Sequence, residues 1–460
     1  MNENGNEDLG HNRRDFLKGG SFATLMTMLG GVELFAQTNA APGGQSTPPV
    51  AKMKVAVIGL GAWGREIVNT LVNPVAPVEP ADLAAICDTY GPALRRTANT
   101  VPGATQTPDY KTILANKDIK AVIIATPTPG HKELALAALK AGKHVYCEAP
   151  LENTIEDARE IALAAKAANR QVFQCGLQKR SDPQRRFLLP FIHSGALGTS
   201  VLARAQWHKK TSWRSASPNP EHEKELNWRL NKATSLGLIG EIGSHQVDQA
   251  GWFLNALPTA VTGFGSIDFW KDGRDVPDTV QAVFEFPAGV RLLYDCTLTN
   301  SFEGEYEVLY GSYAAIMMRE SKAWMFKEVD SPLLGWEVFA AKAQFNDDTG
   351  IVLVAGATKS TSADQTPEAK AAAAAKTPLW HALDNFLRNA VDLSAAAEDF
   401  ITSYGADDVD GLQAALAKAE HRPAANYLEG FQAVVTAVKA NEAILSGKRI
   451  ELKPEWYELS

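Results

Sequence analysis

A glycine-rich turn directly after the first apolar run constrains the fold of this chain most. Residues 52–58 read Lys-Met-Lys-Val-Ala-Val-Ile, which predicts a buried strand, and residues 65–71 have helical spacing. Between them, Gly59 permits a tight turn, Gly61 lets a pyrophosphate approach the backbone, and Gly64 lets the helix pack on the strand. This context predicts a dinucleotide site whose pyrophosphate is held at the helix N-terminus by Gly59, Leu60, Gly61, Ala62, Trp63 and Gly64.

The second apolar run, residues 82–87, ends at an acidic residue, Asp88. It follows Gly64 at about the twenty-residue spacing at which this motif places a ribose-binding carboxylate. A carboxylate there accepts hydrogen bonds from the ribose hydroxyls and repels a 2′-phosphate, which favours NAD. Because Arg95 and Arg96 lie downstream, NADP remains an alternative cofactor.

Strands and helices continue to alternate throughout residues 51–176. Three further apolar runs, separated by segments of helical spacing, lie at residues 120–125, 143–147 and 171–175. The alternation predicts an α/β domain of the Rossmann kind, with a doubly wound parallel sheet. Ligands of such sheets bind at the carboxyl ends of the strands, which here also carry Thr126 and Glu148.

The first forty residues predict an export signal rather than part of a fold. Arg13 and Arg14 are followed by Phe-Leu-Lys and by a weakly apolar run that glycines and Glu33 interrupt. This order is typical of a twin-arginine signal peptide, residues 1–40, with residues 41–50 as a linker. It predicts a periplasmic or otherwise exported protein, the twin-arginine export machinery as a partner, and no stable membrane insertion after cleavage. The alternative is a cytosolic tail with a chance arginine pair.

The four cysteines predict inert thiols. Twin-arginine substrates cross the membrane folded, so the chain folds in a reducing compartment. Each cysteine lies in or beside an apolar run, and we therefore expect buried free thiols at Cys87, Cys147, Cys175 and Cys296.

The composition excludes several classes of protein. With 45% hydrophobic and 21% charged residues among 460, the chain is neither a disordered nor a multi-span membrane protein. The net charge of −8 argues against a nucleic-acid partner.

Three stretches of the chain resemble the Gfo/Idh/MocA oxidoreductases. They are VAVIGLGAWG at residues 55–64, ATPTPGHKELALAALKAGKHVYCEAPL at residues 125–151, and LNWRLNKATSLGLIGEIGSHQVDQAGWFL at residues 226–254. The resemblance implies a second α/β domain, residues 177–460, whose open and mainly antiparallel sheet binds substrate and makes the contacts of a homo-oligomer. Family members mostly oxidise or reduce sugars and cyclitols with NAD(P), which implies a small carbohydrate substrate.

The resemblance also implies roles for individual residues at the nucleotide site. The three turn glycines hold the pyrophosphate and Asp88 holds the adenosine ribose. Thr126, Pro127 and His131 flank the cofactor, and Glu148 reaches the nicotinamide side.

Two departures from the family pattern concern the catalytic residues. The family usually has Glu-Lys-Pro after the fourth strand, and the lysine assists proton transfer, whereas this chain has Ala149 between Glu148 and Pro150. The second motif, Asp-x-Gly-x-His, occurs here as Glu241-Ile-Gly-Ser-His245.

The second motif makes chemical sense by itself. Glu241, His245 and Asp248 have the spacing of one helix face. Histidine exchanges protons near neutral pH, and Glu241 is positioned by this spacing to hold its ring. We therefore predict catalytic roles for His245 and Glu241; a capping or core histidine and a metal trio are the alternatives, and no metal is expected.

Residues that replace the missing lysine are expected after the fifth strand. Lys179 could supply an ammonium group there, and Arg180 could bind hydroxyls or a carboxylate. Trp228, shortly before the second motif, could stack on the C–H face of a sugar. Surface charges and a core tryptophan are the alternatives.

The remainder of the chain predicts the second sheet and its covering helices. A hairpin turn is expected at Gly289, residues 355–377 form a low-complexity loop, and residues 379–390 and 426–446 form amphipathic helices that pack back on the body. Four strands are predicted at residues 201–208, 260–267, 279–286 and 290–298.

Three functions remain open. The first is a periplasmic NAD(P)-dependent oxidoreductase of a sugar, cyclitol or glycoside, with His245 as acid and base. The second is an NAD-dependent glycoside hydrolase or lyase, which oxidises a ring hydroxyl transiently, breaks the glycosidic bond by elimination, and reduces the ketone again. The third is a non-catalytic protein that binds sugar or NAD. The sequence determines neither the sugar, the oxidised carbon nor the oligomer size.

Overall fold

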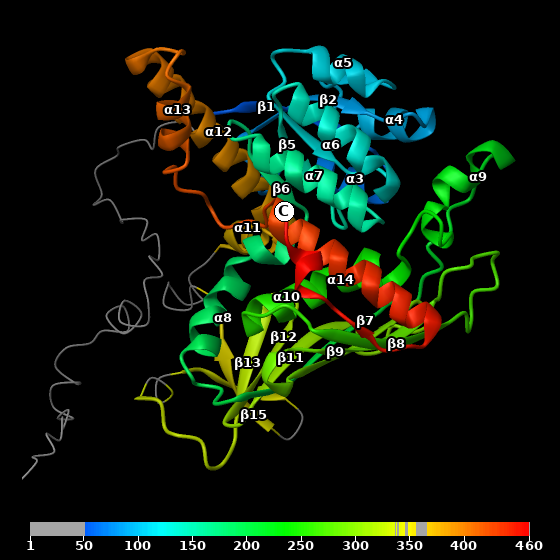
Figure 1. Ribbon diagram of the computed structural model, residues 1–460, viewed down its shortest axis with the longest axis vertical. Coiled ribbons are helices and arrows are strands. Elements are labelled where there is room, and N and C mark those ends of the chain that lie inside the picture. The colour runs from blue at the N-terminus through cyan, green and yellow to red at the C-terminus, as the bar shows by residue number, and fades with distance from the viewer. Residues whose placement is uncertain (1–50, 336, 338–339, 346–347, 356–365, 460) are drawn as a thin grey trace, which may run out of the picture.

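Two β-sheets organise this computed structural model (Figure 1). It describes residues 51–335, 337, 340–345, 348–355 and 366–459. The signal peptide expected at residues 1–40 and the linker expected at residues 41–50 lie outside the described residues. In Figure 1 the first sheet lies above the second, and helix α14 (Tyr427–Ser446, red) runs between them.

The first sheet has the doubly wound order β3-β2-β1-β4-β5-β6, and each neighbouring pair is parallel. The predicted Rossmann domain is therefore confirmed. Its strands are β1 (Met53–Ile58), β2 (Ala81–Cys87), β3 (Thr105–Thr107), β4 (Ala121–Ile124), β5 (His144–Cys147) and β6 (Phe173–Cys175). Its helices are α3 (Ala62–Leu71), α4 (Gly91–Ala98), α5 (Tyr110–Ala115), α6 (His131–Lys140) and α7 (Ile155–Ala167).

The second sheet has the order β14-β15-β13-β12-β11-β7-β10-β9-β8-β16. Among the described strands of this sheet, only β7 and β10 pair in parallel, so the expected mainly antiparallel sheet is confirmed. The predicted strands correspond to β7 (Ser200–His208), β8 (Ala260–Ser266), β9 (Thr279–Glu285) and β10 (Arg291–Thr297). Further strands are β11 (Glu305–Gly311), β12 (Ala314–Arg319), β13 (Lys322–Lys327), β14 (Lys342–Phe345), β15 (Asp348–Leu353) and β16 (Ile450–Glu451).

Strands β11–β15 were missed, and the turn between β12 and β13 shows one reason. The turn between β12 and β13 places Glu320 at φ 53°, a conformation in which glycine or asparagine is the usual signature. The turn between β9 and β10, in contrast, contains Gly289 at φ 80°, and this hairpin was predicted.

Helix α12 (Pro378–Tyr404) begins where an amphipathic helix was predicted but continues well past residue 390. It packs on the first sheet, since Leu383, Phe386 and Leu387 share one apolar cluster with Val55 and Val57 of β1. Its later turns pack through Leu393 on helix α13 (Val409–Leu416). The chain therefore returns, after the second sheet, to complete the core of the first domain.

Part of the loop expected at residues 355–377 is instead a helix, α11 (Pro367–Ala375). The Thr366 hydroxyl accepts a hydrogen bond from the Ala369 N–H, Pro367 occupies the first turn, and alanine favours the helix that follows. None of its residues is buried, in keeping with the lack of an apolar face. Residues 356–365 lie outside the described residues.

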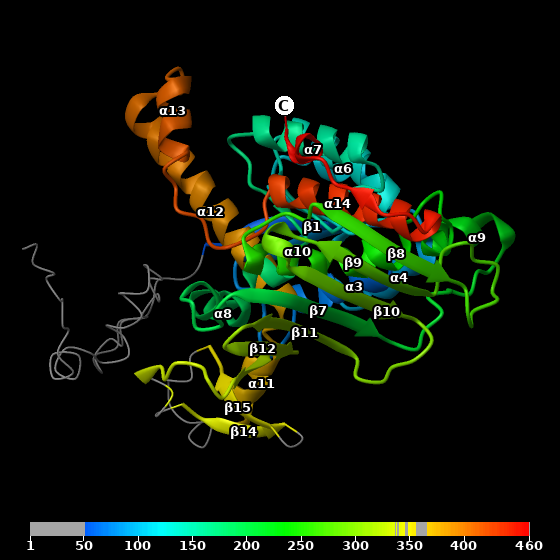
Figure 2. The ribbon, with the colours of Figure 1, turned by 60° about the horizontal axis from the view of Figure 1, so that its bottom comes forward.

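Helix α14 confirms the last predicted helix. Asn426 and Glu429 close its N-terminus with a capping box. The helix contacts α7 of the first domain as well as α10 (Ser244–Leu254) and β8 of the second, so it joins the two domains. The remaining helices are α8 (Pro183–His193) and α9 (Pro220–Leu226), and Figure 2 shows α9 at one end of the second sheet.

All four cysteines are free and buried, as predicted. Within the described residues, no helix combines the length and apolar character that a membrane crossing requires.

Candidate functional site

The glycine turn has the geometry that a dinucleotide site requires. Gly59 has φ 92°, a left-handed conformation that favours glycine, and a Cβ on Gly64 would collide with the Gly59 carbonyl oxygen. A Cβ on Gly61 would meet no protein atom within 4 Å. The protein thus needs the first and third glycines for its own packing, whereas the second leaves open space for a ligand.

The helix that follows the turn offers free backbone donors. Helix α3 has Gly61 as its N-cap, no side-chain cap and no acidic residue in its first turn. Ala62 and Trp63 are exposed at this end, whereas Leu60 is fully buried in the core. Uncapped N–H groups and the positive end of the helix dipole suit a phosphate group.

Asp88 lies at the end of β2 beside the glycine turn. Its Oδ2 accepts a 2.6 Å hydrogen bond from the Leu60 N–H, and its Oδ1 accepts one of 2.7 Å from the Tyr90 N–H. Each carboxylate oxygen retains capacity for a further hydrogen bond. The carboxylate is therefore oriented by the backbone for ribose hydroxyls.

The loop after β4 contains three of the predicted cofactor residues. Thr126 is half-buried and Pro127 is exposed, whereas His131 is almost fully buried. The His131 ring nitrogens lie 3.1 Å from the Pro150 carbonyl oxygen and 3.0 Å from that of Thr126. Burial lowers the pKa of His131 to about 4, so the ring is uncharged and its single N–H donates to one of these two carbonyl oxygens at a time.

Glu148 lies buried at the end of β5. Burial raises the pKa of its carboxyl to about 7, and hydrogen bonding, led by Trp63, acts in the opposite direction. The carboxyl packs against Gly176, where a Cβ would collide with it, and a cis peptide bond joins Ala149 to Pro150. Glu148 is therefore poised between its neutral and ionised forms near neutral pH.

The residues present fit a nicotinamide dinucleotide. Among the described residues, Glu148 Oε1 and Thr126 Oγ1 are buried polar atoms without a hydrogen-bond partner. Both lie just after the carboxyl ends of β4 and β5, the end of the sheet at which the glycine turn follows β1. Unpaired buried oxygens of this kind are costly unless a ligand satisfies them.

Glu241 does not hold the His245 ring as the helical spacing predicted. Residues Ile239–Gly243 form a π-helical turn ahead of α10, and Glu241 in this turn makes its hydrogen bonds to other residues. The Glu241 carboxylate accepts hydrogen bonds from Arg229 Nε at 3.1 Å, Thr128 at 3.4 Å and Ser235 at 3.5 Å. Burial raises its pKa and Arg229 opposes this.

The Thr128–Glu241 hydrogen bond also places the loop after β4 beside the Glu241–His245 motif. Thr128 belongs to the loop after β4 of the first domain, and Glu241 precedes α10 of the second. The helix that carries His245 therefore begins against the strand ends of the nucleotide-binding domain.

His245 is half-buried at the start of α10. In the described part of the chain, its imidazole has no hydrogen-bond or ion-pair partner. Burial lowers its pKa to about 4, the charge of Lys179 lowers it further, and Asp248 opposes both. At neutral pH the ring is therefore an uncharged base whose lone pair is available to a ligand.

Lys179 follows β6 and lies near His245, whose pKa it lowers. Its ammonium group pairs with Glu305 at 2.7 Å and with Glu307, two acidic residues of β11. Gln246 Nε2 donates to Glu307 as well, at 3.2 Å. The predicted lysine is thus present beside the histidine, but two carboxylates hold it.

Arg180 points away from Lys179 towards α10 and α14. It makes a bidentate ion pair with Asp248, with distances of 2.8 and 2.9 Å, and lies 3.7 Å from Glu429. Arg180 and Asp248 line a pocket of about 370 Å³ between α10 and α14, and neither His245, Lys179 nor Glu148 lines it. The structure therefore separates Arg180 from the strand-end site.

Trp228 is half-buried and has one face occupied. The Arg229 guanidinium lies 4.4 Å from the centre of its ring, and the same guanidinium pairs with Glu241. The tryptophan is thereby fixed beside the second motif, with Arg229 rather than a neighbouring core residue stacked on it.

Sequence reasoning missed Arg229, Glu305 and Glu307. Arg229 adjoins Trp228 in the sequence, but nothing local indicates that it pairs with Glu241. The two glutamates alternate along β11, so both lie on one face of the strand. Two acidic residues at this spacing in an otherwise apolar strand were the available signal. Within the described residues, no group of three or more histidine, cysteine or acidic side chains forms a metal-binding cluster.

Comparison with protein families matches both domains. Residues 53–175 match the oxidoreductase family with an NAD-binding Rossmann fold, and residues 189–316 match the GFO/IDH/MocA C-terminal domain. The two matches together cover more than half of the chain.

Curated relatives include dehydrogenases and a reductase. The chain is 28% identical over 204 residues to inositol 2-dehydrogenase of Salmonella typhimurium, covering 44% of this chain and 55% of the relative. It is 32% identical over 210 residues to 1,5-anhydro-D-fructose reductase of Ensifer adhaerens, covering 45% and 59%. The chain therefore spans less than two thirds of these relatives.

Solved structures share the fold over nearly all of their length. Levoglucosan dehydrogenase in complex with NADH and levoglucosan matches with a TM-score of 0.62 and 19% identity, covering 87% of this chain and 99% of the other. Myo-inositol 2-dehydrogenase of Lactobacillus plantarum matches with a TM-score of 0.60 and 19% identity, covering 87% and 100%. Together with the two family matches, the Rossmann sheet and the mainly antiparallel second sheet show that this chain belongs to the Gfo/Idh/MocA family of oxidoreductases.

Proposed function

We propose that this protein is an NAD-dependent oxidoreductase of a sugar or cyclitol hydroxyl, with His245 as the acid and base. The observation that carries the proposal is the unpaired, neutral His245 imidazole, held against the strand ends of a complete dinucleotide site. Two relatives support the substrate class by name, since they are inositol and 1,5-anhydrofructose enzymes.

Each residue of the site has a distinct part in the proposed reaction. NAD, when bound, supplies the hydride acceptor or donor. The His245 nitrogen takes the hydroxyl proton during oxidation and returns it during reduction. Burial keeps this ring uncharged at neutral pH, so it is ready to accept a proton. Glu241 and Arg229 hold the turn ahead of α10, and Lys179 adds positive charge beside the histidine.

Ala149 occupies the position at which the family usually has a lysine that transfers protons. The side chain is half-buried and carries no titratable group, so it neither gives nor takes a proton. Lys179 replaces the missing positive charge only in part, because Glu305 and Glu307 pair with its ammonium group. We therefore assign the proton transfer to His245 alone.

The location and assembly belong to the same proposal. The twin-arginine motif at Arg13 and Arg14 supports export to the periplasm after folding with NAD. The open second sheet supports a homo-oligomer. Fractionation of cells that express the full chain tests the location, and light scattering of the purified protein tests the assembly; a cytoplasmic monomer would contradict both.

One assay tests the proposed reaction. Purified protein, with its bound nucleotide identified, is incubated with panels of free sugars, cyclitols and glycosides while the absorbance of reduced nicotinamide is followed. We expect net reduction of NAD with at least one free sugar or cyclitol. Glycoside cleavage without net reduction would instead identify the redox-assisted hydrolase or lyase. A protein that binds NAD but changes neither substrate nor cofactor would be the non-catalytic binder.

A further inference from the structure

The segment between β7 and Trp228, residues 209–227, packs against the apolar core through Trp213. Its helix, α9, has no buried residue. A seven-residue helix is too short to be stable alone, and burial does not account for its position. Other contacts must hold it in place.

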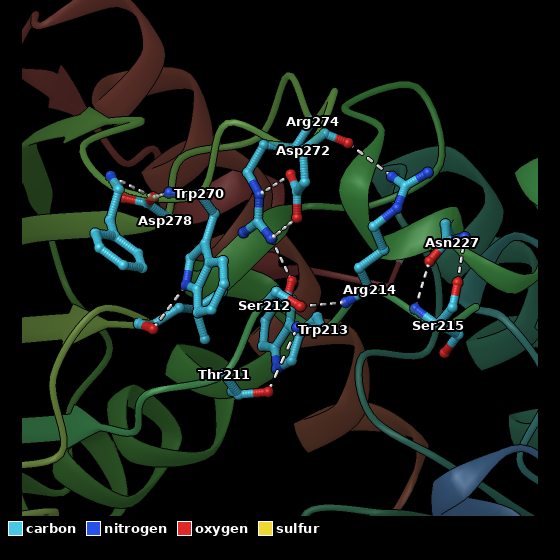
Figure 3. A network of polar contacts seen from close by, with 12 residues as sticks. Thr211, Ser212, Trp213, Arg214, Ser215, Asn227, Trp270, Asp272, Arg274 and Asp278 are labelled. Atoms are coloured by element: carbon cyan, nitrogen blue, oxygen red, sulfur yellow. Dashed lines mark hydrogen bonds and ion pairs between the residues drawn. The ribbon is translucent and has the colours of Figure 1, made fainter.

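Polar contacts fix the start of this segment to a neighbouring loop (Figure 3). The Arg274 guanidinium, buried within the protein, donates two 2.8 Å hydrogen bonds to the Asp272 carboxylate and a further one to the Ser212 carbonyl oxygen. Arg214 Nη1 donates to the Asp272 carbonyl oxygen at 2.7 Å. Residues 212–214 are thereby attached to the turn at residues 272–274.

The end of the segment is closed on its own beginning. The Ser215 N–H donates to Asn227 Oδ1 at 2.7 Å, and Asn227 Nδ2 donates to the Ser215 carbonyl oxygen at 3.0 Å. Arg214 also pairs with Glu223 of α9. Residues 215–227 are therefore a closed projection with a fixed base, and α9 forms its tip.

The tip contacts the first domain at the adenosine end of the dinucleotide site. The His222 ring lies 5.4 Å from the ring of Tyr90, centre to centre, at an interplanar angle of 62°. The Tyr90 N–H donates to Asp88, the carboxylate that the site offers to the ribose. Figures 1 and 2 both show α9 on the side of the first domain where α4 lies.

We propose that Tyr90 and His222 form the outer wall of the adenosine subsite and slow the release of bound NAD. Asp88, which would hold the ribose, is two residues from Tyr90, and the Tyr90–His222 ring pair, which joins both domains, would stand beside the path by which the adenosine leaves. The fixed base makes the contact preorganised, so closing it costs little conformational entropy. This inference rests on the proposed use of NAD but not on the sugar reaction.

Slow release would suit the proposed location. Free dinucleotide is scarce outside the cytoplasm, so an exported enzyme benefits from a cofactor that stays bound between turnovers. The Tyr90–His222 contact provides this without any covalent attachment.

The test measures cofactor release rather than turnover. The full chain is loaded with NADH, an excess of NAD is added, and the loss of bound-NADH fluorescence gives the release rate. We expect His222→Ala to release NADH about three- to tenfold faster, the range that loss of one aromatic contact produces. Lys224→Ala, at an exposed position on the same helix, is the matched control and should release NADH at the wild-type rate.

Two further variants separate the ring contact from damage to the fold. His222→Phe keeps an aromatic ring and should restore slow release, whereas Arg214→Ala loosens the base and should accelerate it. Thermal unfolding without nucleotide should be unchanged in His222→Ala, since α9 buries no residue. Wild-type release rates in His222→Ala would overturn this inference and leave the proposed function intact. Failure of the wild type to bind NADH would overturn the proposed function itself.

Discussion

The two domains build their sides of the site in different ways. On the Rossmann side the functional positions are strand ends and a glycine turn, so each follows from its place in a local pattern. On the other side, Glu241, His245 and Lys179 are oriented by a π-helical turn and by partners from distant parts of the chain. The first side is encoded locally, whereas the second depends on tertiary contacts.

The largest effect is expected at His245. Replacing it with alanine removes the only group to which we assign proton transfer, so kcat should fall by about 10²–10⁴-fold. The Kd for NADH should stay at the wild-type value, because the glycine turn and Asp88 are untouched. Steady-state kinetics and a fluorescence titration measure the two quantities. Turnover at the wild-type rate would remove His245 from the mechanism.

A pair of glycine variants tests the locally encoded side. Gly64→Ala places a Cβ against the Gly59 carbonyl oxygen and should destabilise the fold, by roughly 1–3 kcal/mol or more as overpacking does. Gly61→Ala meets no protein atom and should unfold like the wild type, yet bind NADH at least tenfold more weakly. Thermal unfolding and NADH titration check both. Equal NADH affinity in Gly61→Ala and wild type would contradict the pyrophosphate assignment.

The buried carboxyl of Glu148 predicts a pH-dependent stability. Burial raises its pKa from 4.5 to about 7 in the folded protein. The free energy of unfolding therefore decreases as the pH rises from about 4.5 to about 7, because the carboxyl ionises more easily in the unfolded chain. Glu148→Gln removes this loss of stability and should be the more stable protein above pH 7, by up to about 3 kcal/mol.

The free energies of unfolding of the wild type and Glu148→Gln are measured without nucleotide between about pH 4.5 and above pH 7, and their difference is compared at each pH. It should shrink towards the acidic end of the window, where Glu148 is protonated in both the folded and unfolded states. His131, whose folded pKa is lowered to about 4, affects both proteins equally and cancels. A difference that does not vary with pH would show that Glu148 is not the titrating group.

The smallest expected effect is that of Lys179 on the acid limb of the kcat/KM–pH profile. His245 acts as a neutral base, so kcat/KM should be lost as the pH falls through its folded pKa, about 4. Lys179→Met removes a neighbouring positive charge and leaves Glu305 without its ion-pair partner, whereas Glu307 keeps Arg185 at 3.6 Å; both the lost charge and the unpaired Glu305 raise the His245 pKa. The acid limb should therefore move to higher pH, and Lys179→Arg should keep it in place. An unmoved limb in Lys179→Met would exclude this electrostatic coupling.

Local pattern was sufficient for most of the first domain. The doubly wound parallel sheet, the turn glycines and the position of Asp88 follow from short-range rules of parallel sheets, and the structure has them as predicted, except that the short strand β3 was not predicted. The same rules were insufficient for β11–β15; the turn between β12 and β13, for example, has Glu320 rather than glycine at positive φ.

The catalytic side shows why helical spacing alone misleads. Glu241 and His245 are four residues apart, which in a regular helix puts them on one face. In the π-helical turn that precedes α10, Arg229, Thr128 and Ser235 bind the Glu241 carboxylate instead. All three partners lie outside the helix, and Thr128 lies in the other domain, so no local pattern contains this arrangement.

By itself, the sequence determined the Rossmann fold, the dinucleotide turn and the presence of a histidine in the second motif, because each depends on residues that are neighbours in the chain. Only the tertiary structure decided that His245 stands unpaired, that Lys179 is held by Glu305 and Glu307, and that α9 reaches Tyr90. These features depend on which distant side chains meet, and on burial, which sets the pKa values of His245 and Glu148.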